Sequence, residues 1–260
     1  MLALGVAAPL AGALAGTRAA KAQVALTSQQ LAGQRVVFSY PGLTVPAALL
    51  QQVSAGQAAG VIFFGGNISS DAQIASVIQQ LRQAQQQSPV SSPLLLMTDQ
   101  EGGLVRRLPG APTMSEKQIG ASSNPAAAAS QAGTGAGQNL AGVGMSLNLA
   151  PVLDVYYKSG NFIDQYQRSY SNKASTVTAC GQAFITAQQQ TGMAATAKHF
   201  PGLGSATKSQ NTDAGPAAQD VTQGQAVTSA LAGALDSGQL NSATFNAAVQ
   251  RVTALRAGLH

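Results

Sequence analysis

The stretch Pro93-Leu-Leu-Leu-Met-Thr-Asp-Gln-Glu-Gly-Gly103 joins an uninterrupted apolar run to a polar turn that ends in two glycines. A strand that is apolar at every position is buried on both faces, which is typical of a parallel sheet covered by helices. Polar residues directly after such a strand lie at the carboxyl end of the sheet, where α/β folds place their sites. This stretch therefore predicts an α/β fold with a site beyond the end of the strand.

Four more apolar runs have the same form, and each ends in polar residues, Pro or Gly. They cover residues 35–42, 60–65, 144–155 and 192–198. Stretches rich in Ala and Gln, long enough for helices, lie at 71–87, 124–140 and 176–191. Polar residues follow every strand instead of gathering at one switch point. The pattern therefore predicts a TIM-type (β/α) barrel in preference to a doubly wound sheet.

The strand signals stop too early for a complete barrel. A barrel has eight strand-helix units of about 30 residues each, and the residues after Asp213 are too few for three more. They include one convincing helix at 245–259, with apolar positions at Phe245, Val249 and Val252. We predict an incomplete barrel of about five units plus this closing helix, in one domain at 27–260 that lacks a segment between about 216 and 236.

The N-terminus begins with an uncharged apolar run at residues 2–15, and small residues of the kind that precede signal cleavage follow at Ala20-Lys-Ala22. We interpret residues 1–26 as a signal-like leader, which predicts export to the cell envelope or medium. Because no basic residue precedes Arg18, an apolar N-terminal helix in a cytoplasmic protein is the alternative. The run is too short to span a bilayer, so no stable membrane span is expected.

Composition excludes several classes of partner. The net charge is +5, but the basic residues are scattered and the longest run is Arg106-Arg107, so no nucleic-acid partner is expected. No Gly-x-Gly-x-x-Gly or Gly-Lys-Ser/Thr motif is complete, which argues against nucleotide binding. With two histidines and one cysteine the chain cannot build a conventional zinc site, so we expect no metal and no cofactor. Cys180 shares an apolar helix face with Val177 and Phe184, which indicates an inert core thiol.

Four strand ends and loops carry residues suited to chemistry. Asp99 and Glu101 could serve as general acid and base, or one of them could simply pair with Arg106 or Arg107. Lys198-His199 ends a strand at the expected mouth of the barrel, where it binds a polar ligand or serves only a structural role. Asp154 is interpreted as a structural acceptor for neighbouring loops. Arg168, on its own pattern, is a surface arginine.

Several of these segments together resemble glycoside hydrolase family 3. The segments are Ala32-Gly-Gln-Arg35, Gly60-Val-Ile-Phe-Phe64, Thr98-Asp-Gln-Glu-Gly-Gly-Leu-Val-Arg-Arg107, Asn148-Leu-Ala-Pro-Val-Leu-Asp154, Arg168-Ser-Tyr170 and Lys198-His-Phe-Pro-Gly202. In order and spacing they resemble the N-terminal (β/α) barrel domain of the β-N-acetylglucosaminidase, or β-hexosaminidase, branch. The resemblance runs from about residue 28 to 216.

The resemblance implies a retaining hydrolase that cleaves O-glycosidic bonds in carbohydrate or cell-wall glycans. It also implies a partner, a glycan or glycoside that contains N-acetylglucosamine. Carried over position by position, the residues that hold the hydroxyls and acetamido group of the terminal sugar are Asp99, Arg107, Arg168, Lys198 and His199.

Two departures from the family pattern concern catalysis. Most of this branch carries an Asp-x-His pair after Lys-His-Phe-Pro-Gly, but the loop here offers only Asp213, our candidate acid/base, with a turn-forming Asn-Thr-Asp as the alternative. The aspartate nucleophile of a Thr-Asp strand is also missing, because only Asp220 and Asp236 follow and neither ends an apolar strand. We therefore expect a glycoside hydrolase with impaired turnover, and whether it is an enzyme at all stays open.

Two other interpretations remain. A non-catalytic glycan-binding protein derived from the family would keep the sugar-binding residues without a nucleophile. A partial barrel would also expose open sheet edges, through which the chain could form homo-oligomers.

Overall fold

The computed structural model describes residues 25–207 and 220–259. The predicted leader falls almost wholly on residues 1–24, and Asp213 falls on 208–219, so both lie outside the described residues. The leader and the role of Asp213 stay predictions.

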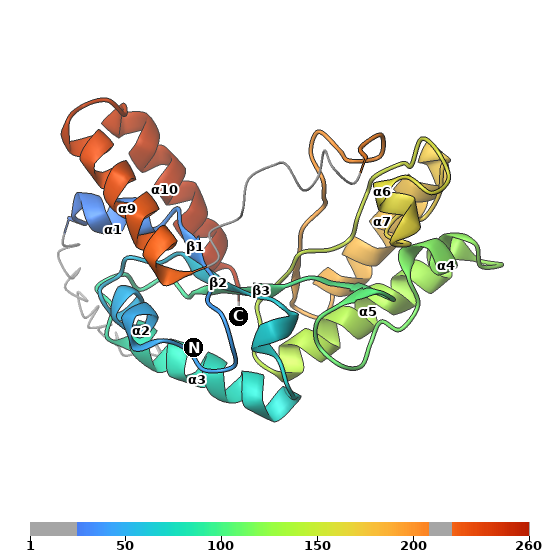
Figure 1. Ribbon diagram of the computed structural model, residues 1–260, viewed down its shortest axis with the longest axis horizontal. Coiled ribbons are helices and arrows are strands. Elements are labelled where there is room, and N and C mark those ends of the chain that lie inside the picture. The colour runs from blue at the N-terminus through green and yellow to red at the C-terminus, as the bar shows by residue number, and fades with distance from the viewer. Residues whose placement is uncertain (1–24, 208–219, 260) are drawn as a thin grey trace, which may run out of the picture.

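One parallel sheet organises the described chain (Figure 1). Its strands are β1 (Val37–Phe38), β2 (Gly60–Phe63), β3 (Leu95–Thr98), β6 (Leu147–Asn148) and β7 (Ala194–Ala195). They lie side by side in chain order, and each neighbouring pair is parallel. Parallel strands in sequence order with helices between them are the arrangement of a (β/α) barrel, so the predicted fold class is confirmed. A small antiparallel hairpin, β4 (Gln100–Gly102) and β5 (Val105–Arg106), follows β3.

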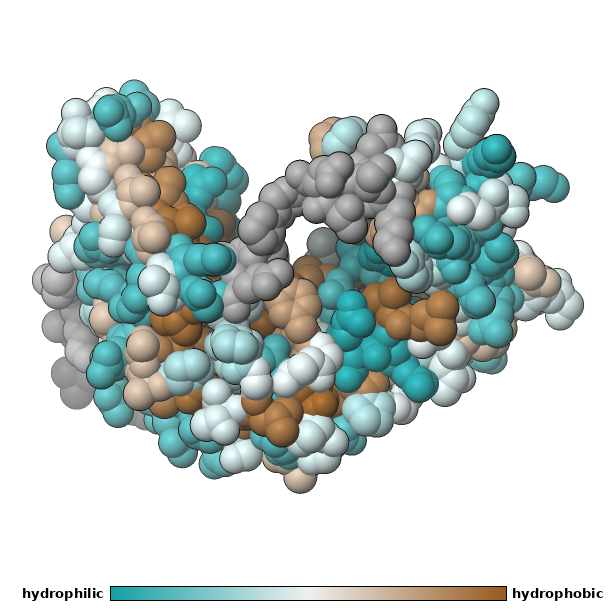
Figure 2. All heavy atoms as spheres, in the orientation of Figure 1, coloured by the Kyte–Doolittle hydropathy of each residue, from teal (hydrophilic) through white to brown (hydrophobic). Residues whose placement is uncertain are grey.

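Helices surround the sheet. They are α1 (Ser28–Gly33), α2 (Ala47–Ser54), η1 (Gly65–Asn67), α3 (Asp71–Gln86), α4 (Glu116–Gly120), α5 (Pro125–Gly142), α6 (Phe162–Gln165), α7 (Ala174–Gln189), α9 (Val221–Asp236) and α10 (Ser242–Ala257). Figure 1 shows α2 and α3 on one side of the strands, α4, α5 and α7 towards the opposite end, and α9 paired with α10 near α1. Figure 2 shows a hollow in the same face between the α9–α10 pair and the part that holds α6 and α7, with hydrophobic residues exposed along it. Within the described ranges, no helix combines the length and hydropathy of a membrane span.

The predicted helices form where the sequence supplies both caps and an apolar face. The Ser70 side chain accepts a hydrogen bond from the first turn of α3, and Asn124 caps α5 ahead of Pro125 at its first position. Helix α3 buries Ile74 and Leu81 against the sheet. The helices predicted at 71–87, 124–140 and 176–191 are confirmed.

Small residues decide how closely α5 and α7 pack. A Cβ atom at Gly133 would lie 2.2 Å from the carbonyl oxygen of Phe184, and one at Gly137 would lie 2.1 Å from Oγ1 of Thr191. Neither contact is possible for a larger residue, so the glycines let the two backbones approach. The buried Cys180 thiol lies in the hydrophobic core between α5 and α7, with Ala132, Val177 and Phe184, as predicted for a core thiol, and burial raises its pKa.

The prediction of a single helix after Asp213 was wrong. Helix α9 precedes α10, begins at Asp220, whose side chain accepts from Gln223 N at 2.8 Å, and packs against α1 and β1. Its buried residues are Val221, Gly224, Thr228 and Ala232, so small side chains outnumber large ones and the apolar pattern typical of a buried helix face is weak. Helix α9 fills most of the interval 216–236 in which we expect a missing segment, and that expectation stays a prediction.

Arg256 fastens the closing helix α10 to the start of the barrel. The side chain is fully buried, and its Nε and Nη2 atoms donate to the carbonyl oxygens of Pro93 and Ser92 at 2.6 and 2.8 Å. Its Nη1 donates to the side chain of Gln34, just after α1. All three acceptors are neutral, and burial lowers the pKa of the guanidinium to about 10.

We predict that Arg256→Ala lowers the free energy of unfolding by about 3 kcal/mol, because it leaves a cavity and buried acceptors without donors. Urea denaturation followed by circular dichroism measures the change. Arg251→Ala, on the exposed side of the same helix, is the matched control and should change stability by less than about 0.5 kcal/mol. Equal effects of the two substitutions would show that Arg256 is not a fastening point.

The sheet has two open edges in the described part of the chain. Each of β1 and β7 pairs with one neighbour only within residues 25–207 and 220–259. Unpaired strand edges are templates for pairing with another chain.

We therefore expect the protein to self-associate through these edges. Light scattering coupled to gel filtration should give a mass that is a multiple of 26.1 kDa and that rises with protein concentration. A mass of one chain at every concentration would reject this expectation.

Candidate functional site

Charged side chains from separate strand ends form one ion-pair network. The Lys198 ammonium, after β7, lies 2.6 Å from Oδ1 of Asp99 and 2.7 Å from Oε1 of Glu101, both after β3. Arg168 binds Glu101 in bidentate fashion, with Nε and Nη2 each 2.8 Å from one carboxylate oxygen. Burial lowers the pKa of Arg168, but the hydrogen bonds and charge of Glu101 outweigh this effect and leave its pKa above the ordinary value.

This network corrects two interpretations made from residues alone. The alternative, in which a carboxylate pairs with Arg106 or Arg107, was wrong, because Asp99 and Glu101 pair with Lys198 and Arg168 and Arg106 donates to the carbonyl oxygen of Gly110 at 2.7 Å. Arg168 is not a surface arginine, since only 14% of its side chain is exposed. Three of the five predicted sugar-binding residues, Asp99, Arg168 and Lys198, thus lie together.

His199 joins the network through Asp154. Its Nδ1 lies 2.6 Å from Oδ2 of Asp154, and its Nε2 lies 3.5 Å from Nη2 of Arg168. The other oxygen of Asp154 accepts from Leu203 N at 2.5 Å. Burial raises the pKa of Asp154, but the bonds from His199 and Leu203 outweigh burial and leave it below the ordinary value. Asp154 therefore receives hydrogen bonds from the neighbouring loop, as interpreted, and also orients the His199 ring.

Arg107 lies outside this network. Its backbone N–H donates to Oε1 of Gln100 at 3.1 Å. Its side chain lies beside Gly65, which follows β2: a Cβ atom added at Gly65 would be 4.0 Å from Cδ of Arg107. Its Nε is buried and has no hydrogen-bond partner among the described residues. The predicted contact of Arg107 with a sugar stays a prediction.

The hairpin that carries Glu101 packs against Met114 and Ser115, which precede α4. A Cβ at Gly102 would lie 2.2 Å from the carbonyl oxygen of Met114, and one at Gly103 would lie 2.5 Å from Cβ of Ser115. Both glycines also have positive φ, at 115° and 55°. The Gly-Gly pair thus lets the hairpin that carries Glu101 pack directly on this segment.

The first turn of α4 also holds the loop that carries Arg168. Ser115 Oγ donates to the side chain of Gln167 at 2.9 Å, and Lys117 N donates to the Gln167 carbonyl oxygen at 3.2 Å. Gln167 has a φ of 57°, a left-handed conformation unusual for a residue other than glycine. The Lys117 ammonium lies 2.7 Å from Asp164 in the same loop. These contacts fix the backbone from which Arg168 reaches Glu101.

Glu116 is a buried acid that the sequence analysis missed. It is 1% exposed, and its Oε1 accepts from Val152 N at 2.8 Å, which ties α4 to the strand end that leads to Asp154. Burial, and then the negative charge of Glu101, raise its pKa well above 4.5. The available signal was the capping box Ser115-Glu-Lys-Gln118, which places an acid in the first turn of a helix beside the predicted site.

The remaining acids do not complete a catalytic pair in the described part of the chain. Asp220 caps the start of α9, and Asp236, at its end, accepts from the Ser28 hydroxyl. Asp236 therefore lies beside the start of α1, and the Asp220 carboxylate is engaged as a helix cap. No cluster of three or more His, Cys, Asp or Glu side chains suited to a metal occurs within the described ranges.

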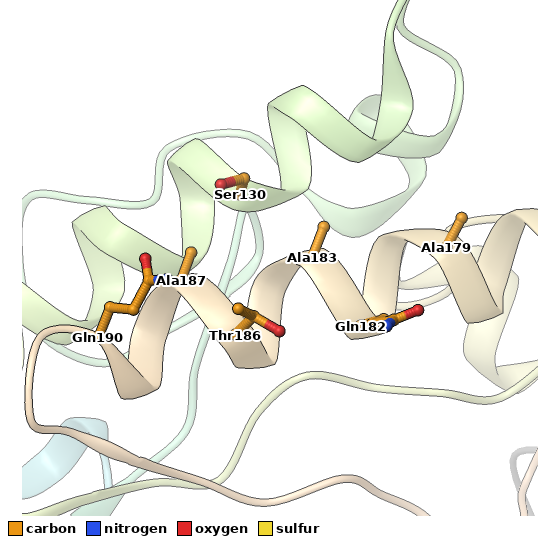
Figure 3. Close-up of a pocket in the computed structure, with 7 residues that line it drawn as sticks. All are labelled: Ser130, Ala179, Gln182, Ala183, Thr186, Ala187 and Gln190. Atoms are coloured by element: carbon orange, nitrogen blue, oxygen red, sulfur yellow. The ribbon is translucent and has the colours of Figure 1, made fainter.

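A cavity of about 370 Å³ opens on the outer face of α5 and α7 (Figure 3). Its lining is Ser130, Ala179, Gln182, Ala183, Thr186, Ala187 and Gln190. These side chains are small or uncharged, so they offer no acid, base or nucleophile. The ion-pair network at the strand ends is the better candidate site.

Comparison with known proteins places the chain in a family. Residues 28–227 match the glycosyl hydrolase family 3 N-terminal domain. The chain belongs to glycosyl hydrolase family 3. The domain of this family is a TIM-type (β/α) barrel, so the five parallel strands are part of a barrel sheet.

Relatives agree with this assignment. A secreted glycosyl hydrolase from Arthroderma benhamiae is 46% identical over 193 residues, which cover 74% of this chain and 54% of that protein. β-Hexosaminidase A from Pseudoalteromonas piscicida is 31% identical and covers 74% of this chain and 35% of that protein. The structure of a family 3 β-N-acetylglucosaminidase from a Paenibacillus species matches with a TM-score of 0.62 and 34% identity, over 69% of this chain and 34% of that one. The family 3 chain thus spans about half the length, or less, of these relatives.

We predict that the native protein loses stability as the pH rises from about 5 to 8, relative to Glu116→Gln. In the folded state Glu116 keeps its proton to a higher pH than it does in the unfolded chain. This proton therefore stabilises the folded state fully below about pH 4.5, and its contribution falls as the pH rises, by at most about 1.4 kcal/mol per pH unit. The glutamine keeps an acceptor for Val152 N and does not ionise.

Urea denaturation across this pH range measures the difference. Asp71→Asn, an exposed acid at the start of α3, is the control and should run parallel to the native protein. Parallel curves for the native protein and Glu116→Gln would show that Glu116 is ionised in the folded state.

Proposed function

We propose that this family 3 chain is a glycoside hydrolase of the β-N-acetylglucosaminidase type whose site binds a terminal N-acetylglucosamine and whose turnover is impaired. The observation that carries the proposal is the network in which Lys198 contacts both Asp99 and Glu101. It presents fixed donors and acceptors at the strand ends of a family 3 barrel.

The network suits a ligand rich in hydroxyl groups. A sugar hydroxyl both donates and accepts, so an ammonium beside a carboxylate can satisfy one hydroxyl in both roles. Asp99 and Lys198 are the more accessible members, with 16% and 13% of their side chains exposed, whereas Glu101 is buried at 2%. We infer that Asp99, Lys198 and His199 touch the sugar, that Arg168 reaches it from its pair with Glu101, and that Arg107 contributes its guanidinium from the β2 side.

Turnover depends on groups that this site does not supply. Retaining hydrolysis needs two carboxyl groups about 5–5.5 Å apart, one of them free to attack the anomeric carbon. Lys198 and Arg168 together neutralise Asp99 and Glu101, and Asp154 is engaged by His199 and Leu203. Asp213 is the candidate acid/base, and we assign no nucleophile.

A non-catalytic glycan-binding protein is the second candidate. The bidentate Glu101–Arg168 pair and the Lys198 contacts hold the proposed binding groups in place without any catalytic carboxylate. We also propose export, supported by the apolar run at residues 2–15 and by the secreted relative from A. benhamiae.

Isothermal titration with N-acetylglucosamine tests the binding site. We expect binding by the native protein and at least a tenfold loss in Lys198→Ala, since Asp99 and Glu101 would then repel each other and lose their shared cation. Lys173→Ala, an exposed lysine before α7, should bind like the native protein. No heat at millimolar sugar would count against the site.

An aryl N-acetyl-β-glucosaminide tests turnover. We expect kcat/KM at least about 10³-fold below that of a full-length family 3 β-hexosaminidase measured alongside, because losing a nucleophile removes the covalent step. Turnover similar to that of the full-length enzyme would contradict impaired catalysis. Binding with no turnover above the buffer rate would favour the non-catalytic candidate.

A further inference from the structure

Glu116 is a buried acid to which the proposed function gives no role. Its Oε1 accepts a hydrogen bond from Val152 N at 2.8 Å, whereas its Oε2 is buried and has no hydrogen-bond partner among the described residues. A carboxylate here would spread its charge over two oxygens of which only one meets a donor. An ionised group that is taken out of water needs more compensation than one neutral backbone donor provides. The surroundings of Glu116 thus favour the uncharged acid.

The hydrogen bond from Val152 connects Glu116 to the backbone of the sugar site. Val152 forms a parallel β-bridge with Lys198, and Leu153 N donates to the Lys198 carbonyl oxygen at 2.6 Å. Asp154 follows Leu153 directly in the chain. Glu116 therefore holds the strand end from which Asp154 extends and to which the backbone of Lys198 is paired.

Several elements place titratable groups around Glu116. They are Glu101 on β4, Arg168 and Tyr170 after α6, Cys180 on α7 and Lys198 after β7. Burial, and then the charge of Glu116, raise the pKa of both Tyr170 and Cys180, so neither adds a charge near neutral pH.

The three charged neighbours act on Glu116 in opposite directions. Burial, and then the negative charge of Glu101, raise the pKa of Glu116. The hydrogen bond from Val152 and the charges of Lys198 and Arg168 lower this pKa by less, so it lies well above 4.5. Glu116 therefore holds its proton over part of the pH range in which exposed carboxyl groups are ionised.

The ion pairs around Lys198 are balanced only while Glu116 is uncharged. Lys198 lies 2.6 Å from Asp99 and 2.7 Å from Glu101, and Arg168 pairs with Glu101, so two cations meet two carboxylates. An ionised Glu116 adds a third carboxylate, which repels Glu101 and attracts the same two cations. Its ionisation thus draws Lys198 and Arg168 away from the positions from which they reach the sugar.

We propose that Glu116 is a positioning residue of the sugar site, which acts through Lys198 and Arg168 without touching the sugar. The uncharged acid holds the strand end and leaves both cations to Asp99 and Glu101. Its ionisation, between about pH 5 and pH 9, weakens the binding of N-acetylglucosamine. The inference rests on the proposed function, because it concerns the affinity of that same site.

Titration calorimetry of the full chain with N-acetylglucosamine, repeated from about pH 5 to about pH 9, tests the proposal against Glu116→Gln. The glutamine keeps an acceptor for Val152 N and cannot ionise, so at about pH 5 its affinity should lie within about twofold of the native one. With rising pH the native affinity should fall at least about fivefold relative to Glu116→Gln, because only the native protein gains the third carboxylate. Both proteins contain His199, so the ratio of their affinities cancels the ionisation of the histidine.

Thermodynamic linkage gives a second measurement, which a purely structural role would not move. If ionisation weakens sugar binding, saturating sugar must raise the pH at which Glu116 ionises by the same factor. Infrared difference spectroscopy follows the C=O band of the protonated acid as the pH changes, and Glu116→Gln lacks that band. The titration without sugar also reports the charge of Glu116 independently of binding.

Asp71→Asn, which changes an exposed acid at the start of α3, is the matched control and should follow the native protein at every pH. A constant ratio of native to Glu116→Gln affinity across the pH range would overturn the inference and leave the sugar site standing. Much weaker binding by Glu116→Gln at about pH 5 would also overturn it, because this variant keeps both the acceptor and the lack of charge. If none of the proteins binds the sugar, the proposed function fails and the inference falls with it.

Discussion

The contact between the Lys198 ammonium and the carboxylates of Asp99 and Glu101 joins the ends of two strands that are not neighbours. Strand β6 lies between β3 and β7, so the lysine side chain has to cross above it to reach both acids. The charges are largely shielded from water, where their attraction is stronger than that of surface ion pairs. Everything else in the site is arranged around this crossing: Arg168 neutralises the second charge on the acidic side, and His199 follows Lys198 in the chain.

The supports of the network converge on a short segment. Ser115, Glu116 and Lys117 are consecutive, yet each contacts a different part of the site: Gln167 beside Arg168, the strand end before Asp154, and Asp164. Such a segment positions several side chains at once, so a change in its backbone would displace donors and acceptors together. This convergence explains why a buried acid is tolerated at position 116.

The sequence predicts those features that depend on local pattern. Apolar runs located all five strands, and polar residues after them located Asp99, Lys198 and His199. Arg168 came only from the family resemblance, because its partner Glu101 is 67 residues away and no periodicity links the two. Glu116 and the pairing of Glu101 with Arg168 were missed for the same reason, since both contacts arise from packing between segments that are distant in the sequence. Helix α9 was missed because its buried face consists of Gly, Thr and Ala with a single Val.

The fastening of α10 by Arg256 has a consequence for how this fold can vary. Arg256 joins the last helix directly to Gln34, just after the first helix, and to Ser92, before β3. The entropic cost of closing a loop grows only slowly with its length. Changes in the length of the connection between β7 and α9 should therefore leave the Arg256 contacts in place.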